Sequence, residues 1–267
     1  MNRHKFSYTA KELLPYIDWS YFFHAWSISH RESCSEAALE LQRDAIEIIT
    51  KADCHVNALF RLCDVHSEGD NLIIDGTLLP LLRQQHSGSG PNLCLSDFVS
   101  PRADKIGLFA TAIESSFEEA RDANDPYHNL LIQTIADRLA EAAATLLHKQ
   151  VRTDAALWGY VPNEHLTIEE LNREQYQGIR PAVGYPSLPD QSVIFIIEKL
   201  LSFKDAGITL TESGAMKPHA AVCGIMISHP AARYFAVGSI SNEQFDDYAQ
   251  RRGIEKNSLS RYLVKNI

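Results

Sequence analysis

The chain has 267 residues, 45% of them hydrophobic and 22% charged, a composition typical of a globular protein that buries a substantial core. Its 34 acidic residues outnumber its 25 basic residues and give a net charge of −9 without a basic cluster, so nucleic acid is not an expected partner. Apolar runs stay far below the roughly 20 residues of a membrane span, no secretory signal is visible, and the five cysteines have irregular spacing, so a cytoplasmic location is expected.

The first half of the chain combines one long helical segment with several short strands. Residues 33–52 carry apolar side chains at helical spacing and predict a helix. A connector rich in glycine and serine is expected at residues 86–92. Four segments predict strands: residues 56–65, 72–75, 94–100 and 106–113.

The second half contains the clearest helix signals. Helices are predicted for residues 126–152, 167–176, 190–204 and 241–253. Pro126 suits a first turn, Thr167 and Ser241 suit N-caps, and Gly253 suits a C-cap. Strands are predicted for residues 208–213, 221–228 and 234–240. Because strands come in clusters, the sequence predicts an α+β fold with mixed helices around a mainly antiparallel sheet.

We expect residues 1–267 to form a single domain, with an N-terminal aromatic segment of about residues 1–30 packing onto it. Asp18 lies in this segment, between Tyr16, Trp19 and further aromatic residues. An acid beside aromatic rings suits a cationic ligand, because the ring faces attract positive charge. The alternative is that Asp18 caps a helix or is simply an exposed acid.

Residues 180–192 read Arg-Pro-Ala-Val-Gly-Tyr-Pro-Ser-Leu-Pro-Asp-Gln-Ser and predict a stiff loop. Pro181 fixes its own φ and restricts Arg180, whereas Gly184 permits a turn that other residues adopt only at a cost. A guanidinium on so rigid a support suits a carboxylate ligand. The alternative is a structural ion pair between Arg180 and Glu174 or another acid.

The predicted helix at residues 126–152 places Asp137, Glu141 and His148 along one face, which is either a solvated face or part of a site. The sequence has no phosphate-binding loop, no nucleophile elbow, no HExxH and no Cys/His pair with zinc spacing. We therefore expect neither a metal site nor a catalytic triad, and assign no catalytic residue.

Taken together, these segments resemble the activation domain of cobalamin-dependent methionine synthase. The hallmark of that family, R-P-A-x-G-Y-P-x-x-P-[DE]-H, is similar to residues 180–191. Further family-like stretches include residues 16–27, 158–164 and 228–240, and all follow the family's order from about residue 13 to about residue 265. The resemblance therefore covers nearly the whole chain and implies the fold of that domain.

The resemblance implies a function in methionine biosynthesis. The chain would bind S-adenosylmethionine and support reductive methylation of cob(II)alamin on a separate methionine synthase, with a flavodoxin-type electron donor. Cobalamin would enter only through this partner, so the chain would be a reactivation component of the methyltransferase class rather than a complete enzyme. The alternatives are a stand-alone S-adenosylmethionine sensor or regulator without methyl transfer, and a degenerate relative that keeps the fold but not the ligand.

The resemblance also implies which residues bind the ligand. Nine correspond to family positions: Asp18, Arg180, Pro181, Ala182, Gly184, Tyr185, Tyr234, Phe235 and Ala236. Asp18 would meet the positive end of the ligand and Arg180 its carboxylate, with Glu141 and Glu174 as secondary candidates. One departure is Gln191, which stands where the family has histidine, and its amide cannot titrate near neutrality.

Overall fold

The part of the chain that the structure describes comprises residues 3–263, apart from 30, 87, 89 and 120–123, together with residue 266, in a computed structural model. The connector expected at residues 86–92 therefore lies partly outside the described residues. Within this described part, no helix has both the length and the apolar character needed to cross a bilayer.

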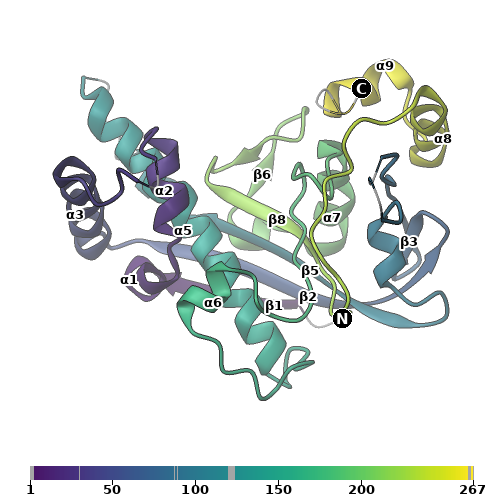
Figure 1. The fold of residues 1–267 in the computed structure, drawn as a ribbon, viewed down its shortest axis with the longest axis horizontal. Coiled ribbons are helices and arrows are strands. Elements are labelled where there is room, and N and C mark those ends of the chain that lie inside the picture. Colours follow the sequence, from purple (N-terminus) through teal and green to yellow (C-terminus); the bar gives the residue numbers. More distant parts are fainter. Residues whose placement is uncertain are drawn as a thin grey trace.

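A six-stranded antiparallel sheet forms the centre of the fold (Figure 1). Its strands are β1 (Arg3–Thr9), β2 (His55–Glu68), β3 (Asn71–Ile74), β4 (Thr77–Pro80), β5 (Asp104–Ile113) and β8 (Ala221–Met226). The order is β4-β3-β2-β5-β8, and β1 pairs with the first half of β2 on the same edge that β3 pairs with further along. A separate hairpin joins β6 (Thr209–Leu210) and β7 (Met216–Lys217). The predicted α+β fold with a mainly antiparallel sheet is confirmed.

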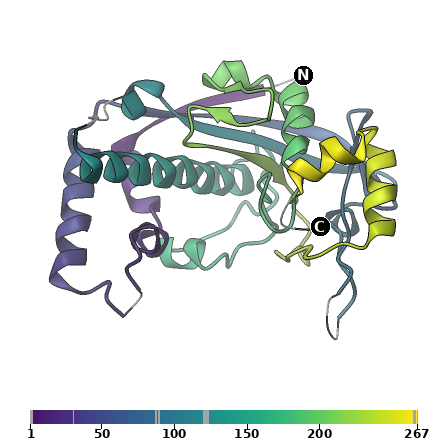
Figure 2. The same ribbon diagram turned by 90° about the horizontal axis from the view of Figure 1, so that it is seen from above.

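Helices cover both faces of this sheet. They are α1 (Ala10–Leu13), α2 (Trp19–Ala25), α3 (Glu36–Lys51), α4 (Ser115–Glu119), α5 (Pro126–Thr153), α6 (Ile168–Asn172), α7 (Ile194–Leu201), α8 (Asn242–Arg252) and α9 (Lys256–Leu259). Figure 2 shows α5 running along one face of the sheet, with α3 near one end and α8 on the far side of the molecule. Helix α5 is the longest of the described helices and carries the largest share of the core on its face.

The alternation of side chains along the strands builds two cores, because successive residues of a strand point to opposite faces. Phe60 of β2 and Phe109 of β5 belong to the buried cluster that contains the apolar face of α5. Their neighbours Leu59 and Leu108 belong to the cluster on the other face, which contains α7. A third, smaller cluster lies under α8 and α9.

The predicted helix signals lie at the observed helix ends. Pro126 is in the first turn of α5, Thr167 forms a capping box with Glu170 at the start of α6, and the Ser241 side chain accepts the first-turn N–H of α8. Gly253 ends α8 in the left-handed conformation, with φ of 62°. The start signals are therefore confirmed at α5, α6 and α8.

Two predicted helices differ in extent from the observed ones. Helix α6 ends at Asn172 instead of residue 176, because the chain turns at Glu174, which has a φ of 56°. The helix predicted for residues 190–204 is an α-helix only over α7, with a 3-10 turn before it and another after it. In both places the local turn geometry shortens the regular helix.

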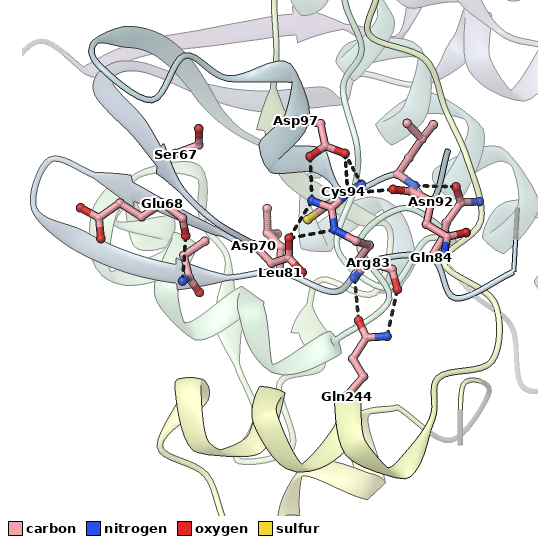
Figure 3. Close-up of polar contacts among 12 residues, drawn as sticks. Ser67, Glu68, Asp70, Leu81, Arg83, Gln84, Asn92, Cys94, Asp97 and Gln244 are labelled. Atoms are coloured by element: carbon pink, nitrogen blue, oxygen red, sulfur yellow. Dashed lines mark hydrogen bonds and ion pairs between the residues drawn. The ribbon is translucent and has the colours of Figure 1, made fainter. Parts of the chain in front are cut away.

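The strand predicted for residues 94–100 is wrong, because this segment forms a 3-10 turn at Leu95–Phe98. The Asp97 carboxylate accepts the Cys94 N–H at 2.9 Å and binds both terminal nitrogens of Arg83 at 2.7 Å (Figure 3). These side-chain contacts close the backbone on itself, so its N–H and C=O groups do not extend a ladder.

The strand predicted for residues 234–240 is also wrong, since this segment has no regular secondary structure. Its backbone bonds to another irregular segment instead. The Val237 N–H donates to the Pro186 carbonyl at 2.9 Å, and the Ser187 hydroxyl donates to the Phe235 carbonyl at 2.8 Å. Conversely, β1 was expected only as part of the aromatic segment and is a strand of the main sheet.

Residues 179–183 lie along the outer edge of β8 and cover it. The N–H groups of Ile179 and Ile227 each donate to the other residue's carbonyl at 2.9 Å, and the Val183 N–H donates to the Cys223 carbonyl at 2.9 Å. This pairing fixes the start of the stiff loop against the sheet.

The loop can approach β8 this closely only because residue 224 is glycine. A methyl group there would lie 2.1 Å from the Pro181 carbonyl oxygen and 2.8 Å from the Ala182 Cα. We predict that Gly224→Ala lowers the free energy of unfolding by about 3 kcal/mol, measured by urea denaturation, because it forces the loop off the strand. Gly90→Ala is the control, since a methyl group at Gly90 meets no described atom within 4 Å. Equal stability of the two variants would contradict this account.

Candidate functional site

A cavity of about 530 Å³ lies between α5, the start of α2, the end of α6 and the loop that follows residue 179. Residues 234–236 also line it. This volume is in the range of sites that hold small organic ligands.

The cavity gathers nearly all residues that the sequence singled out. Ten of the eleven line it: Asp18, Glu141, Glu174, Arg180, Pro181, Ala182, Tyr185, Tyr234, Phe235 and Ala236. Gly184 is not among its lining residues and instead shapes the turn, with a φ of 84° and an N–H that donates to the Leu188 carbonyl at 2.8 Å. The structure thus brings these residues together, while their contacts with a ligand stay a prediction.

Other lining residues were not predicted from the sequence. They are Tyr16, Tyr21, Arg138, Ala142, Thr145, Leu171, Asn172, Tyr176, Pro186 and Ser187. Arg138 and Thr145 lie three residues before and four residues after Glu141, so helical periodicity around Glu141 would have identified both. Asp137, expected on the same face, is not a lining residue and lies 3.8 Å from the His219 ring.

Arg180 is held against α5 with part of its hydrogen-bonding capacity unused. Its Nη2 donates to the Thr145 hydroxyl at 2.8 Å, and its Nη1 lies 3.5 Å from a Glu141 carboxylate oxygen. Its buried Nε has no hydrogen-bond partner in the described part of the chain, although the side chain is only 16% exposed. Arg180 thus pairs weakly with Glu141, and no described ion pair joins it to Glu174.

Glu141 connects helix α5 with the stiff loop across the cavity. Its second carboxylate oxygen accepts the Tyr185 hydroxyl at 2.6 Å. Burial and the neighbouring Glu141 raise the pKa of Tyr185 well above its ordinary value, so the phenol remains protonated and donates. Because the Tyr185 residue is still 50% exposed, it lies at the mouth of the cavity.

Asp18 caps a helix, which was one of the alternatives for this residue, and it also belongs to the cavity lining. As the N-cap of α2, its carboxylate accepts the Ser20 N–H at 2.9 Å and also bonds the Ser20 hydroxyl, and it lines the cavity at the same time. The aromatic residues beside it anchor α2, since the Trp19 and Phe22 rings meet edge to face at 5.1 Å between centroids.

The cavity presents charges of both signs. Its lining includes the carboxyl groups of Asp18, Glu141 and Glu174 and the guanidinium groups of Arg138 and Arg180. Three acids against two arginines suit a ligand that has its own carboxylate together with more than one positive group.

Buried polar side chains of α5 contact the cavity-lining residue Tyr176. His148, expected as part of a helix face, is fully buried, with its Nε2 3.0 Å from the Tyr160 hydroxyl and its ring edge-on to Tyr176 at 4.9 Å. The Arg152 guanidinium lies over the Tyr176 ring, 4.4 Å from its centroid, and forms a buried ion pair with Glu164 at 2.6 Å. The prediction of a solvated face is therefore wrong for His148, and Tyr176 contacts both His148 and Arg152.

Residues 64–69 read Asp-Val-His-Ser-Glu-Gly and match the D-x-H-x-x-G spacing of cobalamin-binding segments. In the structure they form the end of β2 and its turn into β3. Asp64 pairs with Lys105 at 2.5 Å, and the His66 ring lies 3.1 Å from the Glu68 carboxylate. These groups make contacts of an exposed hairpin, so the spacing is no argument that this chain holds cobalamin. Among the described residues, no group of three or more His, Cys, Asp or Glu is placed to hold a metal ion.

Comparison with known proteins gives two matches. A sequence model of the activation domain of vitamin B12-dependent methionine synthase matches residues 9–253. Among solved structures, the chain is similar to the MetH reactivation domain in a crystal structure bound to AdoHcy, with a TM-score of 0.92 and 36% sequence identity. That match covers 100% of this chain and 90% of the other.

His148 makes the stability of the fold depend on pH. Burial, together with Arg152 and Arg180, holds the pKa of His148 well below its ordinary value of 6.5, so the folded protein keeps this ring neutral. The unfolded chain takes up a proton below pH 6.5, so the free energy of unfolding falls as the pH decreases through this value. We predict a loss of about 1 kcal/mol between about pH 7.5 and about pH 5.5 that is absent in His148→Gln.

The free energy of unfolding is measured by urea denaturation at both pH values. His165→Gln is the control because His165 is exposed, and it should keep the pH dependence of the parent chain. An equal loss in the parent chain and in His148→Gln would show that other groups cause the effect.

Proposed function

The chain belongs to the family of vitamin B12-dependent methionine synthase activation domains, and from this premise we propose that its cavity binds S-adenosylmethionine. The observation that carries the proposal is the buried Arg180 guanidinium, which faces the cavity with its Nε unpaired among the described residues. A ligand carboxylate would give this charge the strong partner that Glu141, at 3.5 Å, does not.

The other cavity groups fit the same ligand. S-adenosylmethionine has a carboxylate, an amino group and a sulfonium, so it has one more positive than negative group. The acids at Asp18, Glu141 and Glu174 offset this excess, and the tyrosine and phenylalanine rings offer faces that attract cations and pack on a purine. The related MetH reactivation domain has been crystallised with AdoHcy, which lacks only the methyl group and its charge.

We further propose that the bound ligand serves the reductive methylation of cob(II)alamin on a separate cobalamin-bearing methionine synthase. One electron from a flavodoxin-type donor and the methyl group of S-adenosylmethionine would together convert cob(II)alamin of the docked partner into methylcobalamin, and S-adenosylhomocysteine would be released. The contribution of this chain is to bind the ligand and to orient its methyl group toward the partner. The half exposure of the lining residue Tyr185 supports this proposal, because it leaves the site accessible from outside the chain.

Replacing the arginine tests the ligand assignment directly. We predict that Arg180→Ala weakens S-adenosylmethionine binding by about 2 to 3 kcal/mol in isothermal titration calorimetry, because the ligand carboxylate loses its charged partner. Arg173→Ala is the matched control, since Arg173 is an exposed arginine of the preceding turn that pairs only with Glu169 at 2.6 Å among the described side chains. Unchanged affinity in folded Arg180→Ala would remove this residue from the site.

Methyl transfer to a partner is tested with the complete set of components. The chain is mixed with the cob(II)alamin form of the methionine synthase of its own host, S-adenosylmethionine and a flavodoxin-type reductant, and methylcobalamin is followed by its absorbance. We expect methylcobalamin to form only when all components are present, and more slowly with Arg180→Ala. Tight ligand binding without methylcobalamin formation would support a sensor or regulator instead.

A further inference from the structure

The loop that lines the cavity ends in a deeply buried carboxylate. Asp190 is 1% exposed, and one of its oxygens accepts the Ser192 N–H at 2.8 Å. The other oxygen accepts the Tyr248 hydroxyl at 2.8 Å and the Arg252 Nε–H at 3.1 Å. A buried charge is tolerated only with such partners, so Asp190 depends on both of these side chains.

Both partners come from one face of helix α8, which is about 60 residues further along the chain. Tyr248 and Arg252 are four residues apart and therefore neighbours on the helix surface. Burial, followed by the Asp190 charge, raises the pKa of Tyr248 far above its ordinary value, so its hydroxyl always donates. Arg252 also donates from Nη2 to the Ser192 hydroxyl at 2.6 Å, which connects α8 to the 3-10 turn that precedes α7.

Asp190 is connected to the cavity by a short and highly bonded stretch of backbone. The Gly184 N–H donates to the Leu188 carbonyl, and the Val237 N–H donates to the Pro186 carbonyl. The loop is thus bonded to Val237, the residue after the cavity-lining residues 234–236, at a position shortly before Asp190. Neither Asp190 nor its two partners on α8 line the cavity themselves.

We propose that Asp190, Tyr248 and Arg252 are positioning residues of the ligand site, through which helix α8 holds the cavity-lining loop in its binding conformation. Without this anchor, Pro186 and Ser187 and the backbone bonded to them could move away from the cavity together. The inference rests on the proposed function for its ligand, S-adenosylmethionine, but its structural part concerns only the loop.

The neighbouring arginine of the same helix provides a matched control. Arg251 is also largely buried, and its guanidinium lies over the Tyr248 ring, 5.4 Å from the centroid. Its described hydrogen bonds, however, go to Asp247 of its own helix, to Asn71 and to the carbonyls of Asp70 and Leu81, and none of them goes to the loop. Arg251→Gln and Arg252→Gln therefore remove the same charge from adjacent positions, with anchors in different places.

The test measures affinity for S-adenosylmethionine by calorimetry, and amide hydrogen exchange of the ligand-free proteins. We expect Arg252→Gln to weaken binding about tenfold or more and to speed exchange at Gly184 and Val237. Arg251→Gln should bind within about twofold of the parent chain, even if it unfolds more easily. Arg252→Lys should recover part of the affinity, and Tyr248→Phe, which removes only a hydroxyl, should show a smaller loss in the same direction.

The outcomes separate this inference from the proposed function. If the parent chain does not bind S-adenosylmethionine, the proposed function fails, and the exchange of Gly184 and Val237 still decides whether α8 holds the loop. If the parent binds, and Arg252→Gln and Tyr248→Phe bind equally well with unchanged exchange, the positioning role is wrong while the ligand site stands. Equal losses for Arg251→Gln and Arg252→Gln would reduce the effect to general destabilisation and likewise overturn the inference.

Discussion

The cavity depends on one backbone pairing, in which residues 179–183 lie along the edge of β8. Gly224 makes this possible, because any side chain there would occupy the position of the Pro181 carbonyl. The pairing has two effects. It covers an exposed strand edge, which is a liability in an open sheet, and it fixes the backbone of Arg180 relative to the core. The Arg180 N–H also donates to the Tyr234 hydroxyl at 3.0 Å, so the same segment positions the cavity-lining side chain of Tyr234.

Helix α5 is the second determinant, because it serves the core and the cavity with different faces. Its alanines and leucines fill the cluster under the sheet, while Arg138, Glu141 and Thr145 face the cavity from successive turns. A long helix without internal glycine or proline is a rigid support, so the distance between these groups and Arg180 is set by packing in the core. Further along the same helix, His148 and Arg152 contact the cavity-lining ring of Tyr176.

Much of this arrangement could be predicted from the sequence where the signals are local. The helix caps at Thr167 and Ser241 depend on contacts with the residue three positions further along, and ten of the eleven residues expected from the family-like segments lie in one cavity. The two wrong strands have apolar, strand-like composition, but partners remote in the sequence decide their conformation. Arg83 holds Asp97 in one case and Ser187 bonds Phe235 in the other, and neither contact leaves a signal within the segment. Tyr176 was missed for the same reason, since its support by Arg152 exists only in the folded protein.

The separation of Asp190 from Arg252, 62 residues along the chain, has a consequence for the order in which the protein forms. Synthesis proceeds from the N-terminus, so α5 and most of the sheet leave the ribosome before β8 and α8 exist. When the loop at residues 180–190 leaves the ribosome, it therefore has neither its strand nor its helical anchor. The packing of α5 on β1, β2 and β5 can begin first, whereas the cluster on the other face of the sheet, which contains residues of β8, and the binding site are completed later.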